Sequence, residues 1–194
     1  MTQPVGVLSL QGDFREHLQV FQRLGINAVP VKRAAELVSI SGLVIPGGES
    51  TTIGKLSRIF DIFEPVKQAI ESGLPVFGTC AGLIMLADEI VDGADGQETF
   101  GGLDVVVQRN AFGNQAASFE VDLEFSGVEG LVHAAFIRAP IITRVGKSAH
   151  IVASLKDGRV VGVQQGNRLG ISFHPEVTGE DRIHSYFYDA LVRG

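Results

Sequence analysis

Short, continuous apolar runs alternate with helical patterns through the first half of the chain. The apolar runs cover residues 5–10, 28–31, 43–45 and 75–79. Between them, apolar residues recur at helical spacing, as Phe14, Leu18 and Phe21 do. The predicted helices cover residues 14–24, 51 onward, 62–71 and 81–89. Apolar strands that alternate with helices are typical of a parallel sheet that is covered on both faces.

The second half of the chain has mostly strand-like runs with few helical patterns between them. These runs cover residues 105–107, 119–125, 136–137, 151–155, 160–165 and 169–173. A last helix is predicted over about 181–192, where Thr178 followed by Asp181 resembles a capping box. We therefore expect an α/β fold of three layers. It would have a mostly parallel central sheet, helices on both faces and a small antiparallel section.

The composition fits one domain over residues 1–194, because 45% of the residues are apolar and 20% are charged. A formal net charge of -6 argues against a nucleic-acid partner bound through its phosphates. The single cysteine excludes an intrachain disulfide and suits a reducing, cytoplasmic location. The N-terminus lacks a signal-peptide pattern, and no stretch approaches the ~18 apolar residues that span a bilayer.

The sharpest local signal is the segment Gly78–Gly82 (GTCAG), which lies between a predicted strand and a predicted helix. The pattern resembles a nucleophile elbow, in which flanking glycines permit a tight turn that lifts the side chain above the sheet. The turn would place the Cys80 thiol at a helix N-terminus, which favours the thiolate, and would let the Ala81 N–H donate to an oxyanion. The open alternative is a buried structural cysteine.

A histidine and a carboxylate with matching chemistry occur in the segment Phe173–Glu176 (FHPE). If this segment is extended, side-chain alternation puts His174 and Glu176 on one face. Glu176 could then orient the imidazole, and His174 could take the thiol proton and return it to a leaving amine. An ordinary ion pair at a strand end is the alternative.

The other histidines are weaker candidates for this chemistry. His17 and His184 lie within helical patterns, which predicts surface or packing positions. His133 and His150 have no acidic residue two positions further on.

A Gly-Gly step follows the third predicted strand, in the segment Pro46–Thr52 (PGGESTT). Because glycine tolerates unusual φ and ψ angles, this step can expose backbone N–H groups to an anion. We expect it to supply a second oxyanion donor and one wall of a substrate site. A simple turn capped by Ser50 or Thr51 is the alternative, and the missing G-K-[ST] ending excludes a Walker loop.

The order PGGES, GTCAGL, FHPE resembles that of the class I (triad) glutamine amidotransferases. Further segments resemble one subfamily, the glutaminase subunits of pyridoxal 5′-phosphate synthase, over nearly the whole chain. They are Leu10–Gly12, Arg15–His17, Arg109–Gly113, Ser118–Glu120, Phe136–Pro140 and Ser172–Glu176. The resemblance implies the three-layer class I glutamine amidotransferase-like fold. It makes residues 92–99 a variable surface loop.

The resemblance also implies roles for individual residues. Cys80 would be the nucleophile, His174 the base and acid, and Glu176 the carboxylate that orients it. The Gly47-Gly48 peptide and the Ala81 N–H would form the oxyanion hole. The implied glutamine-binding residues are Gly48, Glu49, Ser50, Arg109, Ile137 and Arg138. An arginine near the substrate's α-carboxylate would act as a bidentate clamp, and the sequence does not tell which of the two, if either, does this through its side chain. Gln11 resembles a family residue near the active site and the partner interface.

The implied reaction is hydrolysis of L-glutamine to L-glutamate and ammonia through a glutamyl thioester, with no metal or organic cofactor. The ammonia would pass through a tunnel to a separate synthase subunit with a (β/α)₈ barrel, which makes pyridoxal 5′-phosphate from a pentose phosphate and a triose phosphate. The isolated glutaminase subunit is expected to be weakly active. The Gly47-Gly48 peptide must turn its N–H inward when the partner docks.

Other functions remain open from the sequence. A glutaminase subunit that serves histidine or purine biosynthesis would share the triad, although the RNAFG and FIRAP segments favour pyridoxal 5′-phosphate synthase. A non-catalytic regulatory domain on the same scaffold is possible, but it would not need all three triad residue types. A cysteine peptidase or related hydrolase fits less well with a Gly-Gly loop ahead of the nucleophile and a late H-P-E.

Overall fold

The computed structural model describes residues 3–109 and 118–194. Half of its main sheet is parallel, with the strand order β2-β1-β3-β4-β12. These strands are β1 (Val5–Leu8), β2 (Ala28–Val31), β3 (Gly42–Ile45), β4 (Val76–Thr79) and β12 (Arg168–Ile171). Every residue of β1, β3 and β4 is buried, so both faces of this half are covered, as the continuous apolar runs predict.

The other half of the sheet is mostly antiparallel and continues from β12 through β11, β9, β6 and β5. Its strands are β5 (Ala87–Ile90), β6 (Leu103–Gln108), β9 (Ile141–Val145), β10 (His150–Ser154) and β11 (Val160–Gln165). Strand β10 pairs with β11 at the side of this path, while β7 (Ser118–Glu124) and β8 (Leu131–Ile137) form a separate two-stranded sheet. The sequence patterns missed β5 and β9.

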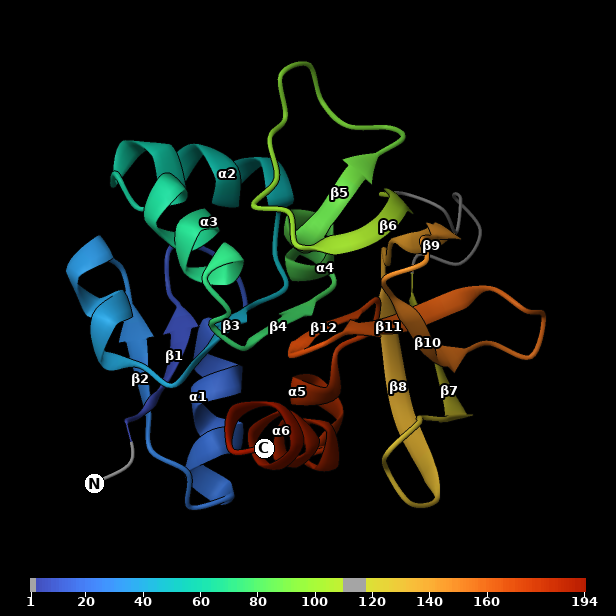
Figure 1. Cartoon of the computed structure of the whole chain (residues 1–194). Coiled ribbons are helices and arrows are strands. Elements are labelled where there is room, and N and C mark those ends of the chain that lie inside the picture. Colours follow the sequence, from blue (N-terminus) through green and yellow to red (C-terminus); the bar gives the residue numbers. More distant parts are fainter. Residues whose placement is uncertain (1–2, 110–117) are drawn as a thin grey trace.

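Helices cover the two faces of the sheet in separate layers (Figure 1). One layer holds η1 (Ala34–Ser39), α2 (Ser50–Ile59), α3 (Phe63–Glu71) and α4 (Ala81–Leu86). The other holds α1 (Phe14–Arg23), α5 (Pro175–Thr178), α6 (Arg182–Tyr186) and the π-helical η2 (Phe187–Val192), next to the β7–β8 ribbon. Phe63 and Leu83 belong to one apolar core and Phe21 and Phe187 to the other. This arrangement confirms the predicted three-layer α/β fold.

Three local predictions are wrong. The helix predicted over 81–89 ends at Leu86, because residues 87–90 pair with β6 instead, a tertiary contact that overrides local propensity. His174 and Glu176 do not lie on an extended segment, since Pro175 begins helix α5, a position that suits its fixed φ angle. Thr178 caps no helix, and its hydroxyl donates to the carbonyl oxygens of His133 and Pro175.

Within residues 3–109 and 118–194, no helix is long and apolar enough to cross a membrane. The carboxyl ends of β1, β3, β4 and β12 meet at one edge of the parallel half of the sheet. The segments that follow these strands carry most of the candidate site residues. Ligands bind at this edge in open α/β sheets.

Candidate active site

Cys80 occupies a strained turn between β4 and α4. Its φ is 49° and its ψ is -103°, a region that L-residues avoid at a cost of about 1–3 kcal/mol. Its backbone N–H donates to the Ile171 carbonyl oxygen at 2.8 Å, which ties the turn to the end of β12. The residue is 7% exposed, so a small part of it remains accessible. This is the strand–turn–helix geometry of a nucleophile elbow.

The two glycines beside Cys80 are required by close packing. A Cβ on Gly82 would lie 2.0 Å from the Ile45 carbonyl oxygen in β3. A Cβ on Gly78 would lie 2.6 Å from the carbonyl carbon and oxygen of Gly82. Neither glycine has a positive φ, so it is the missing side chain, and not backbone freedom, that lets α4 sit close to the sheet.

His174 and Glu176 form a buried pair next to this turn. His174 Nδ1 lies 2.6 Å from Glu176 Oε1, and the His174 backbone N–H donates to the Ala135 carbonyl oxygen at 2.9 Å. Burial disfavours the charged imidazole, but hydrogen bonds with Cys80 and Glu176 outweigh it and raise the pKa of His174 to about 10. The imidazole is therefore positively charged at neutral pH and faces the thiol.

The Glu176 carboxyl is ionised although it is buried. Burial raises its pKa, but the hydrogen bond and the positive charge of His174 counteract burial, and the pKa lies below its ordinary value. Asp13 is a second carboxyl at this place, with Oδ2 3.5 Å from His174 Nδ1, and burial raises the pKa of Asp13. Sequence patterns do not identify Asp13, because it stands in a turn without a motif.

Asp13, His174 and Glu176 bring possible metal-ligand atoms within 4.8 Å of one another. However, the 2.6 Å hydrogen bond to Glu176 already uses Nδ1 of His174. A metal ion at that nitrogen would have to break this bond, so the cluster fits a hydrogen-bonded acid–base pair better than a metal centre.

The Gly-Gly loop packs against the His174 ring. A Cβ on Gly47 would lie 2.4 Å from His174 Cε1, so only glycine fits there. The turn after β1 holds the loop: the Asp13 N–H donates to the Gly47 carbonyl oxygen at 3.0 Å, and the Glu49 N–H donates to Gln11 Oε1 at 2.8 Å. Ala81, the residue after Cys80, is the first residue of α4, so its N–H has no acceptor within the helix.

A polar network joins three of the predicted glutamine-binding residues. Arg109 Nη2 donates to Glu49 Oε1 at 3.0 Å and Arg109 Nη1 donates to Gln97 Oε1 at 2.8 Å. Gln97 Nε2 in turn donates to Ser50 Oγ at 2.9 Å. The Glu49 carboxylate also accepts from the N–H groups of Thr51 and Thr52. Burial raises its pKa, but the bonds from Thr52 and Thr51 outweigh burial and lower it.

Gln97 belongs to the segment 92–99, which the sequence suggests is a surface loop. Residues 92–96 are exposed as expected, whereas Gln97 is half-buried and bonded to Ser50 and Arg109. No motif surrounds Gln97, so sequence reasoning had no signal for it. Of the segment Arg109–Gly113, only Arg109 lies within the described residues, and 110–113 lie outside them.

Ile137 approaches the thiol through its backbone, and Arg138 is the next residue. The Cys80 Sγ lies 4.0 Å from the Ile137 carbonyl oxygen, at the end of β8. Arg138 follows with a φ of 46°, an uncommon value for a residue other than glycine. Its side chain is exposed. The structure thus places the Ile137 backbone beside the thiol, whereas for Arg138 it shows an exposed side chain with a positive φ.

His17 and His184 occupy positions that the sequence left open between surface and packing. Both are fully buried, and they are hydrogen-bonded to each other.

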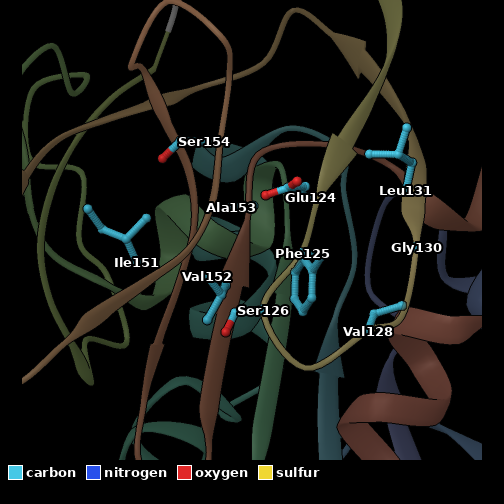
Figure 2. A pocket seen from close by; sticks show the side chains of 10 residues that line it. All are labelled: Glu124, Phe125, Ser126, Val128, Gly130, Leu131, Ile151, Val152, Ala153 and Ser154. Atoms are coloured by element: carbon cyan, nitrogen blue, oxygen red, sulfur yellow. The ribbon is translucent and has the colours of Figure 1, made fainter.

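A separate open groove of about 700 Å³ lies between β7, β8 and β10, lined by residues that include Phe125, Leu131 and Ile151 (Figure 2). None of the candidate site residues described above lines this groove.

Known proteins resemble this chain over nearly its whole length. The model of the SNO glutamine amidotransferase family matches residues 7–193. A relative from Clavibacter michiganensis subsp. michiganensis, named "Pyridoxal 5'-phosphate synthase subunit PdxT", is 60% identical over 188 residues, covering 96% of this chain and 90% of the relative. A relative of the same name from a Nocardioides species is 53% identical over 192 residues, covering 97% and 96%.

Solved structures have the same fold. One, described as "Crystal structure of glutamine amidotransferase", superposes with a TM-score of 0.91 at 50% identity and covers 98% of this chain and 99% of its own. Another, described as "Structure of PurLQS from Thermotoga maritima", superposes with a TM-score of 0.72 at 16% identity, covering 98% and 100%. The second likeness concerns the fold alone.

Proposed function

The chain belongs to the SNO glutamine amidotransferase family, and we propose that it is the glutaminase subunit of a pyridoxal 5′-phosphate synthase. It hydrolyses L-glutamine to L-glutamate and ammonia, and the ammonia serves pyridoxal 5′-phosphate synthesis. Relatives that are 60% and 53% identical carry the name of that subunit, which favours this synthase over one of histidine or purine biosynthesis. The observation that carries the chemistry is the buried 2.6 Å bond between His174 and Glu176, beside the Cys80 thiol.

We assign the catalytic triad to Cys80, His174 and Glu176. Cys80 attacks the carboxamide carbon as a thiolate, while Glu176 holds the charged imidazole through Nδ1. His174 protonates the leaving ammonia and then, as a neutral base, activates the water that hydrolyses the glutamyl thioester. The Ala81 N–H and the Gly47-Gly48 peptide stabilise the oxyanion, and loss of one such donor costs on the order of 10²–10³ in rate. This chemistry needs no metal or organic cofactor.

The Glu49–Arg109 pair suits the zwitterionic end of glutamine, because it offers opposite charges 3.0 Å apart. We assign Arg109 to the α-carboxylate and Glu49 to the α-ammonium group. Arg109 is held by Gln97 and is only 18% exposed, which favours a fixed guanidinium, whereas the Arg138 side chain is exposed. The remaining wall is assigned to Gly48, Ser50 and the backbone of Ile137 and Arg138.

The proposed partner is a synthase subunit with a (β/α)₈ barrel, which receives the ammonia. Two hydrogen bonds join the turn after β1 to the Gly-Gly loop. The Asp13 N–H donates to the Gly47 carbonyl oxygen, and the Gln11 side chain accepts from the Glu49 N–H. The bond from Asp13 holds the Gly47-Gly48 peptide itself, and Gln11 holds the next peptide, Gly48-Glu49. A partner that docks on Gln11 would therefore act on the loop that contains the oxyanion peptide. Docking then shifts the Gly47-Gly48 peptide into its active orientation, and the isolated chain is weakly active.

Residues 1–194 are proposed to form one glutaminase domain, since all the described strands except β7 and β8 belong to one sheet. A catalytic thiol must stay reduced, which supports a cytoplasmic location for the protein.

Reconstitution tests the proposed function. The chain is co-purified with a barrel subunit of pyridoxal 5′-phosphate synthase, and glutamate release from glutamine is measured with and without that partner. We expect strong stimulation by the barrel partner and loss of activity in Cys80→Ala. Stimulation only by a histidine or purine synthase, or unchanged activity in Cys80→Ala, would contradict the assignment.

A further inference from the structure

Two buried histidines outside the triad lie next to Glu176, one beside the carboxylate and the other beside the first histidine. His17 comes from α1 and His184 from α6, and both are 0% exposed. His17 Nε2 lies 3.2 Å from Thr79 Oγ1 and 3.7 Å from Glu176 Oε1. On the other side of the ring, His17 Nδ1 lies 2.8 Å from His184 Nε2. The mechanism described above uses neither histidine.

The surroundings decide which nitrogen of each ring carries the proton. Glu176 is ionised and its Oε1 lies 3.7 Å from His17 Nε2, so the negative charge favours a proton on that nitrogen although the contact is too long for a hydrogen bond. The Thr79 hydroxyl, 3.2 Å from the same nitrogen, is the acceptor for this N–H. Burial lowers the pKa of His17, so the ring is neutral and its other nitrogen, Nδ1, is an acceptor. The 2.8 Å contact then requires that His184 Nε2 donates to His17 Nδ1.

The remaining nitrogen of His184 agrees with this assignment. His184 Nδ1 is buried and has no hydrogen-bond partner among the described residues. Once Nε2 of His184 carries the proton, this atom is a bare acceptor and not an unpaired donor. Buried N–H groups without a partner are rarer than buried acceptors without one.

His17 therefore contacts both the residue before the nucleophile, Thr79, and the carboxylate that binds His174. Its Nε2–H donates to the hydroxyl of Thr79, the residue before the nucleophile, and points its positive end toward the oxygen of Glu176 that binds His174. Glu176 Oε2 has no partner among the described residues, so the environment of Oε1 carries much of the stabilisation of this buried charge.

We propose that His17 is a positioning residue of the triad, which acts through Glu176 and Thr79, and that His184 fixes the tautomer this requires. The proposal rests on the proposed glutaminase activity. A pair of histidines that only filled space would be replaceable by apolar side chains, since the surrounding rings of Phe21 and Phe77 already form an apolar core.

The kinetic test uses the full chain with its barrel partner. His17→Phe should lower kcat about 10–100-fold, as is typical when a residue that orients an active-site group is lost, while KM for glutamine stays within about 2-fold. His17→Gln, whose amide can donate near the Nε2 position, should restore most of kcat. His184→Phe should lower kcat in the same way, because it removes the donor that sets the tautomer.

His133→Phe is the matched control, since His133 is an exposed histidine whose ring, within the described part of the chain, bonds with Asp122 and Glu120 alone. Its kcat should equal that of the wild type. Unchanged kcat in His17→Phe, or equal losses in His17→Phe and His17→Gln, would overturn the proposal. A wild-type complex without glutaminase activity would contradict the proposed function instead.

A spectroscopic test covers the case in which His17→Phe does not fold. Long-range ¹H–¹⁵N spectra of the ¹⁵N-histidine-labelled wild type resolve the tautomers of its 5 histidines. We expect His17 and His184 to be neutral and protonated on Nε2 at neutral pH, with His174 charged. A His17 ring protonated on Nδ1 would overturn the proposal whatever the kinetics of the variants.

Discussion

The backbone of Cys80 combines a reactive side chain with a strained conformation. With φ at 49° and ψ at -103°, the residue holds a position that only glycine adopts without strain. The surrounding structure imposes this conformation: the Ile171 carbonyl oxygen binds the Cys80 N–H, and helix α4 begins at the next residue. The strain directs the thiol toward His174.

The variants Cys80→Ala and Cys80→Gly distinguish the effect of the thiol on activity from the effect of the strained backbone on stability. Both should lose glutamine hydrolysis, because neither has a thiol. Cys80→Gly should be more stable than Cys80→Ala by about 1 kcal/mol, since glycine relieves the positive φ. Urea denaturation of the two variants measures this difference. A Cys80→Gly variant that is less stable than Cys80→Ala would show that the turn is not strained.

The raised pKa of His174 predicts how its contribution to stability depends on pH. The folded value of about 10 lies above the ordinary 6.5, so protonation favours the folded state. This contribution is fully present below about pH 6.5 and is lost as the pH rises through about 10.

The comparison of wild type with His174→Gln isolates this contribution. The difference in unfolding free energy between the two should be largest near pH 6 and should shrink steadily toward pH 10. Urea denaturation at several pH values measures it. A difference that is constant over this range would mean that the folded protein does not hold His174 in its charged form.

At the scale of elements, contacts between glycine and backbone determine how close α4 lies to the sheet. Gly82 lies on α4 against the Ile45 carbonyl oxygen of β3, and neither group has a flexible end that could move away. Gly54 on α2 is a helical glycine with open surroundings, since a Cβ there would meet nothing closer than 3.8 Å.

The two glycines therefore predict opposite effects of the same substitution. Gly82→Ala should destabilise the protein by about 1–3 kcal/mol, because the added methyl group would overpack rigid backbone. It should also lower glutamine hydrolysis, because it shifts the Cys80 turn. Gly54→Ala should be neutral or stabilising by up to about 1 kcal/mol, because alanine favours helix. Thermal or urea denaturation of both variants tests this, and equal effects would contradict it.

At the scale of the whole molecule, separate segments meet at the carboxyl ends of the parallel strands. Gln11 follows β1, Gly47 follows β3, Cys80 follows β4 and His174 follows β12. Figure 1 shows these four strands side by side. A partner that contacts the first of these segments can act on the others, because Gln11 and Asp13 hold the Gly-Gly loop beside the His174 ring.

Gln11→Ala should therefore weaken stimulation by the barrel partner. The variant loses the acceptor for the Glu49 N–H, so docking can no longer transmit an orientation to the oxyanion peptide through this bond. We expect the partner-stimulated rate to fall by about 10-fold or more, up to the 10²–10³ of a lost oxyanion donor. Glutamate release with saturating partner measures the rate, and Gln164→Ala, on β11 outside the site, serves as control. Full stimulation of Gln11→Ala would exclude this route.

The sequence by itself determined the parallel half of the fold and indicated the candidate triad, because these features have local signatures. Continuous apolar runs indicate buried strands. The motifs GTCAG, PGGES and FHPE can be recognised because the residues of each motif are adjacent in the sequence. It misassigned the segment after β12, since the contact between His174 and Glu176 comes from the start of a helix and not from strand alternation.

Only the tertiary structure decided which residues support these motifs. Asp13, Gln97 and His184 have no motif around them in the sequence. His17 lies in the segment Arg15–His17, but nothing in that segment predicts a contact with Glu176. All four reach the site through contacts with distant segments. Strands β5 and β9 likewise exist because they pair with β6. Burial, pairing and the tautomer of a histidine depend on what surrounds a residue in space, and a linear pattern of residue types does not carry that information.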